Sequence, residues 1–139
     1  MKLLDTNVLN YHRDKGSQFK AWADQAIEEA ILFGGAAVNP VVLAEFCSWV
    51  KSDPKAVPGE LEAIGIDLVD LPTAAGPICG AAYAKYAAAR KTGSQKDASA
   101  VPLPDFLSGA HAEALGWIVV TNDPGHFRTY FPSVKLETP

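Results

Sequence analysis

The sequence predicts an α/β fold with a mostly parallel central sheet. Short apolar runs that stop at polar residues alternate along the chain with longer segments whose apolar residues recur at helical spacing. Glycine or proline marks many of the boundaries between these segments, as expected where helices begin and end. Strands that alternate with helices in this way are typical of parallel sheets whose faces are covered by helices.

In the first half of the chain, the apolar pattern predicts three strands and three helices. Asp5 stands at the end of the first strand, and we interpret Thr6 and Asn7 as a turn. Gly34 ends the longest helical pattern, and Pro40 suits the first turn of the next helix. The expected elements, in chain order, are a strand over residues 2–5, a helix over 18–32, a strand over 36–39, a helix from 40 to about 52, a short helix over 60–64 and a strand over 66–71.

The second half continues the alternation. Thr73 can cap an alanine-rich helix, Pro104 can open another, and Gly116 can end it. Residues 117–121 form the clearest strand pattern in the chain, and this pattern runs directly into a turn. The expected elements are a helix from 73 to about 90, a mobile loop over 91–102, a helix over 104–115, a strand over 117–121, a turn over 122–125 and a strand over 134–136.

Length and composition limit the class of protein. The 139 residues suit one domain over residues 1–139, and 48% hydrophobic with 20% charged residues is ordinary globular usage. No apolar run reaches the roughly 18 residues that span a bilayer, and no signal-peptide pattern is present, so we expect a cytoplasmic protein without a membrane partner. Cys47 and Cys79 belong to no CxxC pair, and we expect two small apolar residues rather than a zinc site or a disulfide.

The formal net charge of −4 argues against a protein that binds nucleic acid through general basicity. Any contact with nucleic acid must therefore be local. One candidate is a run of basic residues from Lys85 to Lys96, which also contains Arg90 and Lys91. Such a run is more often a solvated surface, so both interpretations stay open.

Four carboxylates stand out by position. They are Asp5 and Asp123 just after strands, Glu45 within a helix and Asp105 at a helix start. Each alone has an ordinary explanation, such as turn chemistry or interaction with a helix dipole. Together they indicate a site, because open parallel sheets bind ligands at the carboxyl ends of their strands. Carboxylates gathered there repel unless a hard cation lies among them, and oxygen ligands suit Mg²⁺ or Mn²⁺.

These acids stand in sequence contexts that resemble PIN-domain nucleases over the whole chain. The contexts are Leu4-Asp5-Thr6-Asn7, Val41 to Phe46 around Glu45, Pro104 to Ala112 around Asp105, and Val120-Thr121-Asn122-Asp123. The closing stretch, residues 123–132, is similar to one branch of VapC toxins. The resemblance implies a PIN domain, a Rossmann-like three-layer sandwich with a central parallel sheet in the order 3-2-1-4-5.

The resemblance also assigns roles to individual residues. The four acids Asp5, Glu45, Asp105 and Asp123 would form the metal-binding and catalytic quartet, with Thr6, Asn7 and Thr121 as supporting polar residues. One departure is Asn122, because many relatives of this branch have arginine there. A phosphate contact or charge balance usual at that place is therefore in doubt.

The function implied by the resemblance is that of a toxin in a type II toxin–antitoxin system. The protein would be a metal-dependent endoribonuclease, with Mg²⁺ (or Mn²⁺ in its place) activating water for hydrolysis of RNA phosphodiester bonds. A cognate antitoxin and a homodimer are also implied. For the dimer, Trp22 and Trp49 are candidate packing surface, although tryptophans at such positions more often belong to the core.

Other interpretations stay open beside this one. His12, His111 and His126 could support acid–base cleavage without metal, although core or surface roles are commoner and only His126 follows a site acid closely. A haloacid dehalogenase-type enzyme would need an acid at Asn7 and a late lysine. A non-catalytic module could be a receiver-like pocket, which needs a lysine that residues 117–127 lack, or an inactive PIN-like domain, which usually lacks some of the four acids.

Overall fold

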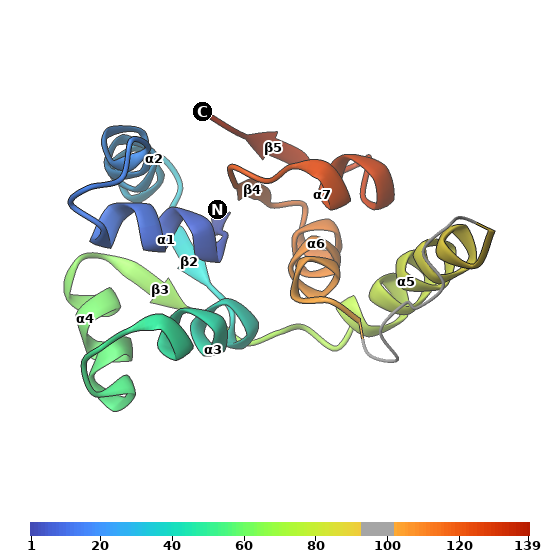
Figure 1. The fold of residues 1–139 in the computed structure, drawn as a ribbon, viewed down its shortest axis with the longest axis horizontal. Coiled ribbons are helices and arrows are strands. Elements are labelled where there is room, and N and C mark those ends of the chain that lie inside the picture. Colours follow the sequence, from blue (N-terminus) through green and yellow to red (C-terminus); the bar gives the residue numbers. More distant parts are fainter. Residues whose placement is uncertain (93–101) are drawn as a thin grey trace.

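A five-stranded parallel sheet forms the centre of the structure, a computed structural model that describes residues 1–92 and 102–139 (Figure 1). The strands are β1 (Lys2–Leu4), β2 (Ala36–Val38), β3 (Ile66–Leu68), β4 (Ile118–Val120) and β5 (Lys135–Glu137). Their order is β3-β2-β1-β4-β5, which confirms the predicted parallel sheet and its order. Because Leu4 pairs with Val120, the residues that follow β1 and β4 lie side by side at the carboxyl edge.

Helices connect the strands, and most of them lie close to their predicted ranges. They are α1 (Thr6–Arg13), α2 (Lys20–Leu32), α3 (Pro40–Trp49), the 3-10 helix η1 (Pro54–Ala56), α4 (Val57–Ala63), α5 (Ala75–Thr92), α6 (Pro104–Leu115) and α7 (Gly125–Tyr130). Local signals explain several boundaries. The Asn39 side chain accepts hydrogen bonds from the Val41 and Val42 N–H groups at the start of α3. Gly116 ends α6 in the left-handed conformation, with φ of 65°.

Each face of the sheet has its own hydrophobic core, because successive strand residues point to opposite faces. Leu4 and Val120 pack with residues of α1, α2, α3 and α4 on one face. Leu3 and Val119 pack with residues of α5, α6 and α7 on the other. Figure 1 shows these two groups of helices on opposite sides of the strands. The result is the predicted sandwich of three layers.

Two short helices differ from the sequence prediction. The turn predicted at Thr6 and Asn7 is wrong, because α1 begins at Thr6 with Asp5 as its N-cap. The burial of Val8 and Leu9 stabilises this eight-residue helix, which is too short to be stable by propensity alone. Helix α7 was likewise not predicted: it begins at Gly125, the last residue of the turn predicted over 122–125, and Phe127 is its fully buried residue.

Cys79 is buried in the second core, and Cys47 is partly buried against the first, so both act as apolar packing residues. No helix within residues 1–92 and 102–139 is long and apolar enough to cross a membrane. Most of the loop predicted over 91–102 lies outside the described residues.

Candidate functional site

Asp5 lies at the carboxyl edge of the sheet, where it is both a helix cap and an acceptor for two neighbouring side chains. Its Oδ1 accepts a hydrogen bond of 2.7 Å from the Thr6 N–H. Its Oδ2 accepts from Asn7 Nδ2 at 2.7 Å and from Thr121 Oγ1 at 2.6 Å. The residue is 8% exposed. Asp5 is therefore a buried carboxylate whose orientation is set by three donors.

The ends of β1 and β4 are joined by polar side chains from both segments. Thr121 is fully buried, and its Oγ1 also accepts hydrogen bonds from Asn7 Nδ2 at 3.1 Å and from the Asp123 N–H at 2.9 Å. Asn7 Oδ1 accepts from the Asn122 N–H at 3.0 Å. Thr6, Asn7 and Thr121, the supporting polar residues implied by the resemblance, thus lie beside Asp5.

Asn122 stands where many relatives have arginine, and in this structure its side chain binds another protein side chain. Its Nδ2 donates to the Tyr11 hydroxyl at 3.0 Å. The side chain therefore joins the loop after β4 to α1.

Glu45 approaches Asp5 from the middle of α3. Its Oε2 accepts a hydrogen bond of 2.7 Å from Thr6 Oγ1, so Thr6 connects the two acids: its N–H binds Asp5 and its hydroxyl binds Glu45. Glu45 is only partly exposed, unlike a solvent-facing helix residue. Helix α3 contacts α1 because Val42 and Phe46 pack in the same core as Val8.

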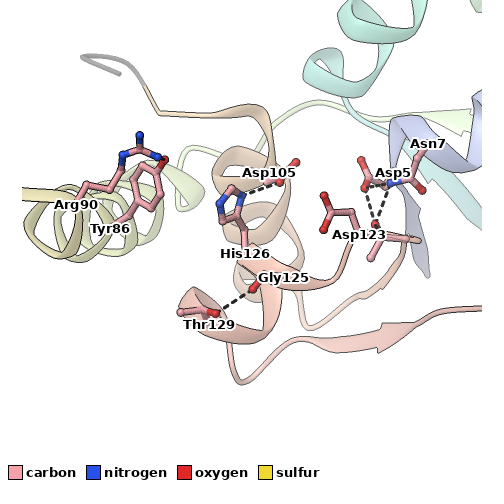
Figure 2. A network of polar contacts seen from close by, with 10 residues as sticks. Asp5, Asn7, Tyr86, Arg90, Asp105, Asp123, Gly125, His126 and Thr129 are labelled. Carbon is pink, nitrogen blue, oxygen red and sulfur yellow. Dashed lines mark hydrogen bonds and ion pairs between the residues drawn. The ribbon is translucent and has the colours of Figure 1, made fainter. Parts of the chain in front are cut away.

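Asp105 and Asp123 complete the set from the other side of the sheet. Asp105 lies in the first turn of α6, and its Oδ2 is 3.0 Å from His126 Nδ1. Asp123 follows β4 and is exposed. In Figure 2 its carboxylate points toward the space between Asp5 and Asp105. The structure thus brings the four predicted acids to one edge of the sheet.

The charges of Asp105 and Glu45 act on the carboxylate of Asp5. The pKa of Asp5 is raised from 3.8 to about 6, and the largest cause is the burial of its carboxylate. The negative charges of Asp105 and Glu45 raise the pKa as well. Hydrogen bonds from Thr121 and the Thr6 N–H lower it, but they do not outweigh burial and like charge.

Acidification of the metal-free protein should stabilise the fold through Asp5. The pKa of the folded state is about 6 and lies above the unfolded value of 3.8, so the folded state binds more protons between the two values. The unfolding free energy therefore rises as the pH falls through this window, by up to about 3 kcal/mol from this residue.

The measurement is the difference in unfolding free energy between wild type and Asp5→Asn in chelator, from neutral to acidic pH. The difference is needed because burial lowers the pKa of His111, which destabilises the fold on acidification and is present in both proteins. As the pH falls, the unfolding free energy of wild type should rise relative to that of Asp5→Asn. A difference that stays constant with pH would contradict the raised pKa of Asp5.

The donor chemistry of this site fits a divalent cation. Its ligands are carboxylate and hydroxyl oxygens, which Mg²⁺ and Mn²⁺ prefer, and a cation would relieve the repulsion that raises the pKa of Asp5. As the side chains stand, however, no three His, Cys, Asp or Glu residues of the described ranges form a group that could hold a metal ion. The acids would have to move closer together to ligate one.

The other residues singled out in the sequence lie elsewhere. His111 is fully buried beside Trp117, which confirms a core role. His12 binds Asp24 at the surface. Trp22 is partly buried against the first core, whereas Trp49 is 76% exposed.

The basic run from Lys85 to Lys96 lies partly in α5 and partly outside the residues that the structure describes. Lys85 and Lys91 are exposed on α5, and Arg90 donates to the Tyr86 hydroxyl at 2.7 Å with its guanidinium 5.3 Å from the Tyr86 ring centroid. Lys96 lies outside the described residues. Figure 2 shows Arg90 and Tyr86 on the far side of His126 from Asp5.

Sequence analysis singled out His126 as a residue near the site acids, but it did not predict that its partner is Asp105. The pairing of His126 with Asp105 joins α7 to α6, and the only local signal is that His126 follows Asp123 by three residues. Tyr86 was not singled out at all, although its ring packs edge-on against His126 with centroids 5.6 Å apart. An alanine-rich helix gives no indication of which of its aromatic residues faces a site.

Comparisons with known proteins agree with the fold. Residues 2–132 match the family described as PIN domain. VapBC2 from Rickettsia felis, solved bound to a promoter DNA fragment, contains a similar chain with a TM-score of 0.72 and 20% identity, covering 99% of this chain and 98% of that one. A toxin–antitoxin complex from Klebsiella pneumoniae has a TM-score of 0.66 at 18% identity, covering 100% and 98%. FitAcB from Neisseria gonorrhoeae has a TM-score of 0.64 at 21% identity, with coverages of 100% and 98%. No curated protein matches the sequence.

Proposed function

Because the chain belongs to the PIN-domain family, we propose that it is a divalent-metal-dependent endoribonuclease and the toxin of a type II toxin–antitoxin system. One observation carries the proposal. Asp5 is buried at the carboxyl edge of the sheet, and the charges of Asp105 and Glu45 act on it there. Keeping such mutually repelling acids together destabilises the fold, and a bound cation is the simplest compensation.

In this proposal Asp5, Glu45, Asp105 and Asp123 hold the cation. When bound, the cation supplies Lewis-acid activation of water and stabilises negative charge on the phosphate. The chain's own residues supply the positioning. Three donors fix Asp5 before any ligand arrives, and the Thr6 hydroxyl fixes Glu45. These hydrogen bonds order two of the four acids in advance, so fewer side chains have to be ordered when the acids gather around a cation.

The exposed position of Asp123 and the partial exposure of Asp105 leave the site open to a long substrate. An RNA strand can reach such an edge, whereas an enclosed pocket would admit only a small molecule. Without a cation, however, the carboxylates would repel a phosphodiester group. Turnover should therefore require added Mg²⁺ or Mn²⁺.

The test is incubation of the purified chain with total bacterial RNA, with Mg²⁺ and with a chelator, followed by mapping of the RNA ends. Discrete new ends that need the metal are expected. The alternative is a non-catalytic PIN-like module, which is favoured by the absence of a gathered ligand group within the described residues. Binding of Mn²⁺ without cleavage of any cellular RNA would support that alternative.

A cognate antitoxin is part of the proposal. The Klebsiella pneumoniae chain was crystallised in a toxin–antitoxin complex, and the same kind of partner would protect a cell from an open nuclease site. Its chemistry can be specified. An arginine guanidinium would pair with one or two of the four carboxylates and compete with the cation, while an apolar segment would supply most of the affinity.

Expression of this chain alone should arrest bacterial growth, and co-expression with the short open reading frame beside its gene should restore it. The reason is that hydrolysis of cellular RNA stops translation unless the site is blocked. Growth curves after induction measure both effects, with Asp5→Asn as the inactive control. Equal growth in all three cultures, with the protein present in the supernatant, would contradict a toxin role.

We also propose a homodimer, for which the exposed Trp49 is a candidate packing residue. Light scattering should give twice the mass of a single chain, which is 14.8 kDa. A monomer mass at micromolar concentration would contradict the dimer without affecting the nuclease proposal.

A further inference from the structure

We propose that His126 is a positioning residue that orients the Asp105 carboxylate for binding a divalent cation, an inference that rests on the proposed function. His126 lies in the first turn of α7, and Asp105 lies in the first turn of α6. Their side chains meet with His126 Nδ1 at 3.0 Å from Asp105 Oδ2, as Figure 2 shows.

The direction of this hydrogen bond follows from the chemistry of the pair. An ionised carboxylate only accepts hydrogen bonds, so Nδ1 carries the proton and donates it to Oδ2. Within residues 1–92 and 102–139, the other oxygen of Asp105 makes no hydrogen bond to a protein group. The contact therefore orients the carboxylate and leaves Oδ1 available as a ligand.

Aromatic side chains fix the imidazole ring, so the donor has a defined position. The Tyr86 ring packs edge-on against it with centroids 5.6 Å apart, and Phe106 packs at 5.4 Å in a tilted arrangement. Tyr130 lies at 6.3 Å on the same helix as His126. Tyr86 is itself held by the hydrogen bond from Arg90. Packing sets the ring's orientation before any metal binds.

Such a partner has a use at Asp105 because the like charges of Asp105 and Asp5 repel each other. The Asp105 charge acts on Asp5, which also interacts with Glu45, so repulsion drives the Asp105 side chain away from the site. The side chain is 30% exposed, and rotation toward water is open to it. The bond from His126 opposes that rotation and keeps the carboxylate at this edge of the sheet.

The experiment separates the hydrogen bond from the ring packing with two opposite substitutions. His126→Phe keeps an aromatic ring among Tyr86, Phe106 and Tyr130 but removes the donor. His126→Asn removes the ring but places an amide nitrogen at the same distance along the side chain as Nδ1.

Mn²⁺ binding to the full chain is measured by calorimetry, and the melting temperature in chelator reports on folding. His12→Phe is the matched control, since His12 binds Asp24 in the same way outside the site.

Loss of a partner that orients a metal ligand weakens metal binding by about 10- to 100-fold. We expect this loss of Mn²⁺ affinity in His126→Phe, with affinity retained in His126→Asn and in the His12→Phe control. If wild type binds Mn²⁺ and His126→Phe binds it equally well, the positioning role is overturned while the proposed function stands. Loss in His126→Asn but not in His126→Phe would assign the residue to packing instead. Failure of wild type to bind Mn²⁺ at all would overturn both proposals.

Discussion

Asp5→Asn and Asp123→Asn should each lower Mg²⁺-dependent RNA cleavage by at least about a thousandfold, because each removes a charge from the proposed cation site, whose effect on the transition state is several kcal/mol. The substitutions are nearly isosteric. In Asp5→Asn the amide oxygen of the new side chain can still accept from the Thr6 N–H, so α1 keeps its N-cap. Cleavage rates at saturating RNA and circular dichroism spectra measure activity and fold separately.

Asp67→Asn is the matched control for these two variants. Asp67 is an exposed acid on the edge strand β3, and its carboxylate lies near Gly35, at the opposite end of the sheet from Asp5. The control removes the same charge from the protein and should cleave RNA as wild type does. Near wild-type cleavage by Asp5→Asn or Asp123→Asn would show that the residue concerned has no role in the reaction.

Gly109→Ala should cost at least about 2 kcal/mol of unfolding free energy, although alanine favours a helix by about 1 kcal/mol over glycine. Gly109 is buried in α6, and an added Cβ would lie 2.4, 2.6 and 2.8 Å from three atoms of the Phe131 ring. Phe131 is 1% exposed, so its ring is enclosed by other groups and moves only if they move as well. Denaturant unfolding measures the loss.

Gly80→Ala is the matched control, because Gly80 lies inside α5 and an added Cβ there meets no atom within 4 Å. This variant should gain up to about 1 kcal/mol from helix propensity alone. Adding Phe131→Leu to Gly109→Ala should recover part of the loss, since the smaller side chain relieves the contact. If both glycine variants change stability equally, the close approach of α6 to Phe131 is not a real constraint.

The elements that sequence analysis placed well are those with strong local signals. Residues 104–115 were predicted as a helix, and α6 spans the same residues because Pro104 starts it and Gly116 ends it. The apolar runs that became β1, β2 and β4 end at polar residues, which placed Asp5 and Asp123 after adjacent strands once the strand order was known. The order itself came from the family resemblance, because periodicity does not specify which strands are neighbours.

Local sequence failed where tertiary contacts stabilise a short element. Helices α1 and α7 are eight and six residues long, and neither has an apolar pattern long enough to be distinguished from a turn. Val8 and Phe127 are fully buried, and it is their packing against the two faces of the sheet that stabilises these helices. For the same reason, the local pattern around Asp5 does not identify this residue as a helix cap.

The sequence by itself determined which residues could form a site: four acids, the polar residues around them and their places at strand ends and helix starts. Only the tertiary structure decided how those residues interact. Burial between β1, β4 and α1 raises the pKa of Asp5, and Thr121 and His126 reach Asp5 and Asp105 from distant segments. Burial and hydrogen bonding between segments depend on how the helices pack on the sheet, and packing is a property of the whole chain that local patterns do not contain.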